Sequence, residues 1–167
     1  GLYQPQSGSI MIGGMEMRLV AEDLLWTKLG YMAQDSRLMN GTLRENLVLG
    51  LPDPGDGAIM EAAQETGLHQ IISSHPQGLG LAITEGGRGL STGQRTLVAA
   101  TRLLLAKPKV WLLDEPAAAL DNDSEIRLMT AINKAAGRDG TLVLVTHKHS
   151  LLQHVQRVIL LIGGKIV

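Results

Sequence analysis

Two adjacent carboxylates, Asp114 and Glu115, stand directly after the apolar run 110–113. Mg²⁺ prefers carboxylate and water oxygens, so Asp114 could hold this ion beside a phosphate. Glu115, one position further on, could accept a proton from an attacking water. The structural alternative is a helix start or a solvated turn, because acidic residues are common before a helix. Taken alone, the pair favours this structural interpretation.

A second candidate is the segment Ser91-Thr92-Gly93-Gln94. Ser91 and Gln94 have the spacing of a capping box, which is the default interpretation. However, glycine in a helix costs about 1 kcal/mol relative to alanine. At Gly93 it would let another molecule approach the exposed N–H groups, where an anion would also meet the helix dipole. We therefore expect a side chain at Gly93 to block an anion while leaving the fold intact.

Gln34 and His147 each end a strand-like run. Neither residue is informative by itself, since a lone polar residue at a strand end is ordinary. Their positions gain meaning from the elements around them. Apolar runs at 30–34, 110–113 and 141–146 alternate with helical patterns at 21–29, 42–50, 58–67, 68–75, 91–108 and 123–136. Glycine pairs predict hairpins at 9–20 and 157–167, and glycine and proline predict loops at 51–57 and 78–89.

This alternation predicts an α/β domain with a mostly parallel sheet that is covered by helices on both faces. In such folds ligands bind beyond the carboxyl ends of the strands. Asp114, Glu115 and His147 all stand at such ends, so the sequence predicts one site at this edge of the sheet.

Composition narrows the classes of function. The chain has 167 residues, of which 44% are hydrophobic, so it can form one folded domain with an aliphatic core. Its net charge of −1 argues against a broad nucleic-acid-binding face. It has no cysteine, which excludes a disulfide framework and a thiolate metal site. No apolar run approaches the ~20 residues that would span a bilayer.

Taken together, the motifs resemble the nucleotide-binding domain of the ATP-binding cassette (ABC) transporter family over essentially the whole chain. "YMAQD" is similar to the Q-loop, "LSTGQ" to the signature motif, and "VWLLDEP" to Walker B with its catalytic glutamate. "ALD" at 119–121 is similar to the D-loop, and "VTH" to the switch histidine. The resemblance implies a P-loop NTPase-like fold in which a helical subdomain, about 35–95, is inserted in a RecA-like core.

The resemblance also implies ATP and Mg²⁺ as cofactors and a role for each matched residue. Asp114 would organise Mg²⁺, and Glu115 would be the general base for water. His147 would contact the γ-phosphate. Gln34 would sense the metal and the attacking water.

The remaining matched residues would act across a dimer of nucleotide-binding domains. The signature residues Ser91, Thr92, Gly93 and Gln94 would face the opposite subunit, with Ser91 and Gly93 contacting the γ-phosphate of its ATP. Asp121 would lie at the dimer interface. The implied partners are a second nucleotide-binding domain and the transmembrane domains of a transporter, at the cytoplasmic face of a bacterial inner membrane, with no nucleic acid.

Two departures from the family pattern stand out. The phosphate-binding motif G-x-x-x-x-G-K-[ST] has no match, since Gly164-Lys165 is followed by Ile166. The family would place it upstream of the first residues given, together with a strand and a helix, so we expect the chain to be inactive by itself. Thr92 replaces the usual glycine of the signature, and its side chain could hinder a phosphate.

Three functions remain open. "GTLRENLVLG", "ITEGGRGLS" with Glu85, and "HPQG" resemble exporters, the last of them type I secretion ATPases for proteins or peptides. A non-transport ABC ATPase of DNA repair or chromosome structure is less favoured, because the interval from Gln34 to Ser91 is short. A non-catalytic interaction subunit stays open because the phosphate-binding motif is absent, although Glu115 and His147 argue against it.

Overall fold

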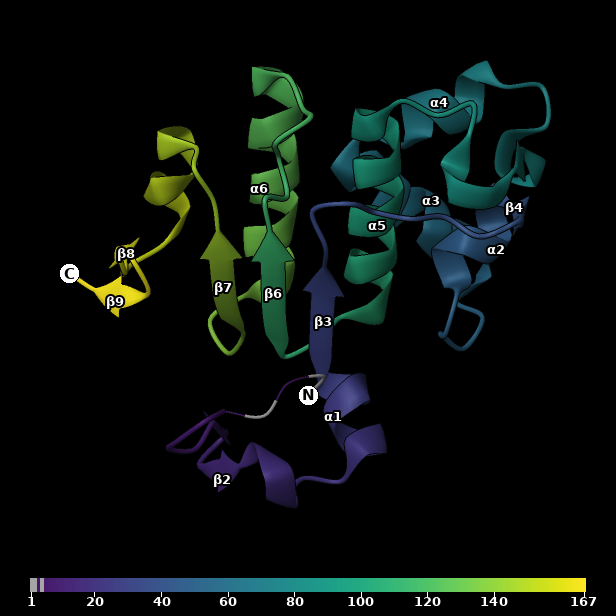
Figure 1. Ribbon diagram of the computed structural model, residues 1–167. Helices are drawn as coiled ribbons and strands as arrows, with labels where there is room; N and C mark the ends of the chain where they lie inside the picture. Colours follow the sequence, from purple (N-terminus) through teal and green to yellow (C-terminus); the bar gives the residue numbers. More distant parts are fainter. Residues whose placement is uncertain (1–2, 4) are drawn as a thin grey trace.

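The computed structural model describes residue 3 and residues 5–167, and its centre is a three-stranded parallel sheet (Figure 1). The strands are β3 (Leu29–Met32), β6 (Val110–Asp114) and β7 (Thr141–Val145), in the order β3-β6-β7. In this register Leu113 pairs with both Met32 and Leu144. The parallel arrangement confirms the prediction and brings the carboxyl ends of the strands to one edge of the sheet.

One face of the sheet is covered by α5 (Thr92–Ala106) and α6 (Asn122–Ala136) (Figure 1). Trp111 and Leu113 of β6 point toward these helices and are buried with residues of both. The opposite face is open. Tyr31 and Val145 on that face are 60% and 56% exposed. Of the predicted helices on both faces, the described residues therefore show those on one face, because in residue 3 and residues 5–167 no helix packs against this second apolar surface.

A second hydrophobic cluster lies beside the sheet domain and is formed by the helices between β3 and α5. These helices are α2 (Leu43–Val48), α3 (Gly55–Thr66) and α4 (His69–Ser74). Leu47, Ile59 and Leu68 are fully buried in the cluster, and Val98 of α5 joins them. α5 thus contributes to both clusters, so it fixes the helical part against the sheet.

Local sequence signals account for the ends of these helices. Thr42 and Glu45 form a complete capping box at α2, and Ser91 and Gln94 form the predicted one at α5. Gly67 ends α3 in the left-handed conformation that glycine adopts without strain. Two short strands were not predicted: β4 (Gly41–Thr42), at the start of a predicted helix, and β5 (Ala82–Ile83), in a predicted loop, pair with each other.

The two ends of the chain carry short elements, and both predicted glycine hairpins are present. The N-terminal elements are β1 (Met11–Ile12), β2 (Met15–Glu16), η1 (Met17–Leu19) and α1 (Glu22–Lys28). The C-terminal elements are η4 (His149–His154), β8 (Leu161–Ile162) and β9 (Lys165–Ile166). Two further 3₁₀ helices, η2 (Gly78–Gly80) and η3 (Glu85–Gly87), lie between α4 and α5. The Gly164-Lys165 pair lies at the β8–β9 turn, in an exposed hairpin.

Candidate functional site at the carboxyl edge of the sheet

Asp114 is the last residue of the central strand β6 and pairs with Val145 of β7. Side chains alternate along a strand, so Asp114 lies on the same face as Leu112, opposite to the buried Leu113. This is the face that α5 and α6 leave open. The carboxylate is half-buried there. It is therefore accessible to a ligand that approaches the open face at the carboxyl end of the sheet.

Glu115 begins the loop after β6 in an unusual backbone conformation, with φ at 48°. Its N–H donates to the carbonyl of Val145 at 2.9 Å. Its carboxylate accepts a hydrogen bond from the backbone N–H of His147 at 2.8 Å and from the Thr146 hydroxyl at 3.3 Å. The left-handed turn therefore directs the carboxylate toward the end of β7, where the two residues that follow this strand, Thr146 and His147, hold it by hydrogen bonds.

The imidazole of His147 lies beside this carboxylate. The distance from its Nε2 to Glu115 Oε1 is 3.8 Å, and the His147 side chain is 98% exposed, whereas that of Glu115 is 11% exposed. The predicted base and the predicted phosphate ligand are thus neighbours. The Glu115 carboxylate is fixed by a backbone N–H group, whereas the His147 imidazole projects into the solvent.

Gln34 lies two residues beyond the end of β3, in an exposed position. Because β3 and β6 are parallel neighbours, Gln34 follows the same edge of the sheet as Asp114. Within the described part of the chain, no hydrogen bond joins Gln34 to Asp114 or Glu115. The structure therefore places the three residues at one edge without direct contact between them.

The signature segment forms the N-terminus of α5. The Ser91 hydroxyl accepts the Gln94 N–H at 3.2 Å, and the Gln94 side chain accepts the Ser91 N–H at 2.8 Å. Thr92 accepts a hydrogen bond from the Arg95 guanidinium at 3.1 Å. Ser91 and Thr92 are exposed, so the helix end is open to a ligand even though both polar side chains of the box are paired within the chain.

A contact that cannot be read from the sequence explains why position 93 is a glycine. A Cβ atom at this position would lie 2.8 Å from the carbonyl oxygen of Ala119 and 3.4 Å from a methyl carbon of Leu120. The absence of a side chain therefore lets the loop after β6 pack directly on the first turn of α5. The expectation that a side chain at Gly93 would leave the fold intact is wrong, because the neighbouring atom is backbone and cannot rotate away.

Asp121 ends that loop and caps α6. One carboxylate oxygen accepts the Ser124 N–H at 3.0 Å, and the other accepts the Ser124 hydroxyl at 2.8 Å. These hydrogen bonds, that of the N–H first, hold the pKa of Asp121 below its ordinary value. Its side chain is nevertheless exposed. The predicted helix at 123–136 begins one residue later than α6, which starts at Asn122.

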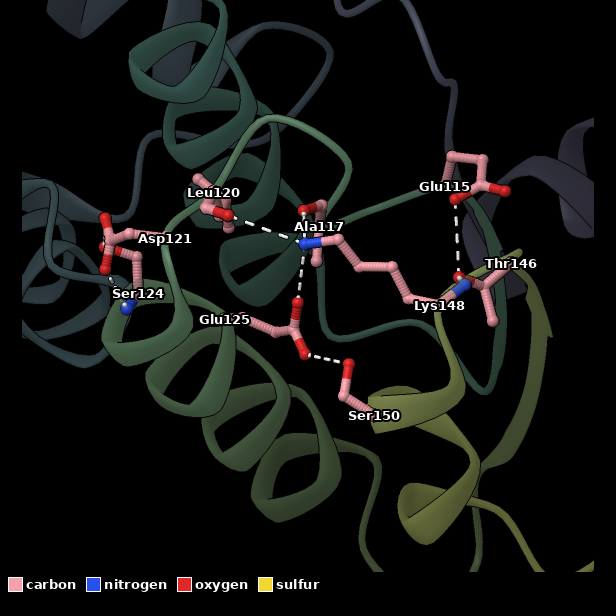
Figure 2. A network of polar contacts seen from close by, with 9 residues as sticks. All are labelled: Glu115, Ala117, Leu120, Asp121, Ser124, Glu125, Thr146, Lys148 and Ser150. Atoms are coloured by element: carbon pink, nitrogen blue, oxygen red, sulfur yellow. Dashed lines mark hydrogen bonds and ion pairs between the residues drawn. The ribbon is translucent and has the colours of Figure 1, made fainter.

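A polar network that was not predicted from the sequence lies next to this loop and includes Glu125, Lys148 and Ser150 (Figure 2). Glu125 is only 4% exposed although it is charged. A signal for it was present: Glu125, Leu128, Met129 and Ile132 have the spacing of one helix face. A carboxylate on an apolar face needs a partner, and Lys148 supplies it at 2.7 Å.

Residue 3 and residues 5–167 hold no group of three or more histidine and acidic side chains arranged to bind a metal ion. In the same part of the chain, no helix combines the length and the apolar character that a membrane span requires.

A parallel sheet with Asp114 and Glu115 at its carboxyl edge, a signature-like helix start and an inserted helical part defines a P-loop NTPase-like α/β domain. The family model for ABC transporters matches residues 1–118. The chain therefore belongs to the ABC transporter family.

Curated relatives and a solved structure agree with this assignment. The chain is 31% identical to an uncharacterized ABC transporter ATP-binding protein, YfiC of Bacillus subtilis, over 99% of the chain and 27% of the relative. It is 34% identical to the leukotoxin translocation ATP-binding protein LktB of a Pasteurella haemolytica-like species, over 99% of the chain and 23% of the relative. A bacterial Atm1-family ABC exporter with ATP bound matches at a TM-score of 0.93 and 28% identity, over 99% of the chain and 29% of that structure's chain. The chain thus spans about a quarter of the length of the relatives that it matches.

Proposed function

We propose that this chain forms part of the ATP-binding and ATP-hydrolysing domain of an ABC exporter. The observation that supports it most is the position of Glu115, directly after Asp114 and held by the amide of His147 at the sheet edge. Similarity to a leukotoxin translocation protein and to a putative multidrug export protein, YgaD of Bacillus subtilis, favours export over other work of the family.

Glu115 is the proposed general base. An ionised carboxylate offers about four acceptor positions, and the His147 amide and Thr146 hydroxyl occupy two. The others remain for the water whose proton is removed. The His147 amide orients the carboxylate, and the exposed imidazole is free to donate to the γ-phosphate.

The donor set fits Mg²⁺ held together with a nucleotide. Asp114 supplies one carboxylate on the open face, and Gln34 supplies an amide oxygen at the same edge. Mg²⁺ typically takes one or two protein ligands and completes its octahedron with phosphate oxygens and water. When bound, the ion would neutralise developing charge on the phosphates. Asp114 and Gln34 would orient it.

We propose further that ATP is sandwiched between two such domains. The segment Ser91, Thr92, Gly93 and Gln94 would face the nucleotide of the partner domain, with the N–H groups of Thr92 and Gly93 presented to it while those of Ser91 and Gln94 are held in the capping box. The exposed Asp121 would lie at that interface. The segment of about 35–95 would be the helical subdomain, and the assembly would work with transmembrane domains at the cytoplasmic face of a membrane.

The test is Glu115→Gln in the longer protein that contains this chain. The glutamine oxygen can still accept the His147 N–H, so the loop keeps its position while the base is lost. We expect nucleotide binding to persist and the rate of hydrolysis to fall about 10²- to 10⁴-fold.

The matched control is Glu61→Gln, which makes the same chemical change at an exposed position of α3. It should hydrolyse ATP like the wild type. If Glu115→Gln turns over ATP as fast as Glu61→Gln, the proposed role of Glu115 is refuted.

A further inference from the structure

Lys148, the residue directly after His147, extends toward Ala117 and Glu125 (Figure 2), and its side chain is 33% exposed. Its ammonium donates to the carbonyl of Ala117 at 2.7 Å and to Glu125 at 2.7 Å, and the carbonyl of Leu120 lies at 3.5 Å. An ammonium has three N–H donors, and all three directions are met by acceptors of this chain. One side chain therefore joins the segment after β7 to the loop after β6 and to α6.

Glu125 keeps Lys148 in this position. Its side chain is 6% exposed, and its second oxygen accepts the Ser150 hydroxyl at 2.5 Å. A buried carboxylate is costly unless it is paired, so a displaced Lys148 would leave an uncompensated charge beside the apolar core. Replacing such a pair by apolar residues often costs little, whereas breaking it costs much. The pair therefore specifies a geometry more than it adds stability.

The geometry that it specifies is that of Glu115 relative to His147. The Glu115 carboxylate reaches forward to the His147 amide, and the Lys148 ammonium reaches back to Ala117, two residues after Glu115. These two contacts run in opposite directions between the same two segments. They close a short ring of residues in which neither segment can slide past the other.

We propose that Lys148 is a positioning residue: it holds the Glu115 carboxylate and His147 in the arrangement that hydrolysis requires. This inference rests on the proposed function. Lys148 need not touch the nucleotide. Its ammonium acts through Ala117 and Glu125, and its loss would loosen the loop from Glu115 to Asp121 while the nucleotide contacts stay intact.

The experiment uses the longer protein that contains this chain and four variants. Lys148→Met removes the ammonium and keeps the length of the side chain. Lys148→Met combined with Glu125→Gln also removes the unpaired charge, so this double variant separates positioning from a folding defect. Lys148→Arg keeps the charge and the donors. Lys134→Met is the control, because Lys134 lies on α6 with Glu125 but forms an exposed ion pair with Glu65 of α3.

We expect the double variant to lose about 10- to 100-fold in kcat for ATP hydrolysis, as small misplacements of reacting groups do, with KM nearly unchanged. Lys148→Arg should recover most of the rate, and Lys134→Met should match the wild type. A wild-type kcat in the double variant would overturn the proposal. So would a loss that appears only as a higher KM, or one that Lys148→Arg fails to recover.

Amide hydrogen exchange provides a readout that does not depend on hydrolysis. In the double variant, the His147 amide and the amides of 117–121 should exchange faster, whereas those of β6 should not change. If the wild-type protein fails to hydrolyse ATP, the proposed function fails, and this exchange comparison still decides whether Lys148 fixes the loop. Unchanged exchange at 117–121 and His147 would overturn the positioning role.

Discussion

The close approach of Ala119 to Gly93 leads to a quantitative prediction about Gly93→Ala. The new Cβ would lie 2.8 Å from a backbone oxygen, nearer than a carbon atom normally stands. The loop that carries Ala119 would have to move, and this loop runs from Glu115 to Asp121. The substitution therefore tests whether the N-terminus of α5 and the loop are packed as the structure describes.

The expected free-energy change has two opposing parts. Overpacking a tight contact costs about 1–3 kcal/mol. Replacing glycine by alanine in a helix contributes up to about 1 kcal/mol of stability. The net effect of Gly93→Ala is therefore a loss of about 0–3 kcal/mol in the free energy of unfolding.

Gly57→Ala isolates the steric part. Gly57 lies in the first turn of α3, and a Cβ there would have no atom within 4 Å. This control should stabilise by up to about 1 kcal/mol, so the two variants should differ by about 1–3 kcal/mol. Urea unfolding of both variants, followed by far-ultraviolet circular dichroism, measures the difference. Equal stabilities would refute the reasoning, because they would mean that Ala119 does not pack against Gly93.

Three more predictions follow from burial and charge. Leu128→Ala should cost about 2–5 kcal/mol in thermal or urea unfolding because Leu128 is fully buried, whereas Ile126→Ala, exposed on the same helix, should change stability by less than about 0.5 kcal/mol. The Lys148 hydrogen bond, with that of Ser150 and the charge of His154, holds the pKa of Glu125 below its ordinary value of 4.5. The stability that Glu125 adds is therefore present above that value and lost as the pH falls through the lowered pKa, so wild type and Glu125→Gln should converge in unfolding midpoint at low pH. The 167-residue chain should not bind Mg²⁺-ATP tightly, because a triphosphate needs a nest of N–H groups and a lysine that its motifs do not supply; a micromolar Kd by calorimetric titration would contradict this.

Local signals predicted much of the fold. The capping box at Ser91, the helix predicted at 58–67 and the strand predicted at 110–113 all depend on residues near in sequence. Such features can be read from residue type and spacing. The residues of the predicted site at the sheet edge also follow this logic, because a parallel sheet brings the ends of its strands together.

What could not be predicted depends on contacts between distant segments. The number of covered faces depends on which helices pack where, and the apolar runs of β3 and β7 look the same with one covered face or two. The Lys148–Glu125 pair joins residues 23 positions apart. Gly93 is needed because of Ala119, which no spacing rule reveals. Each of these features requires the tertiary arrangement first.

The left-handed backbone of Glu115 has a consequence for how this position can change over time. A residue other than glycine pays about 1–2 kcal/mol for this conformation, which glycine adopts without strain. A substitution to glycine would therefore relieve the backbone strain at this position, but it would also remove the carboxylate. Under the role proposed for Glu115, stability and activity select opposite residues at this position, so a copy of this chain that no longer hydrolyses ATP should lose this glutamate early, before it loses the core.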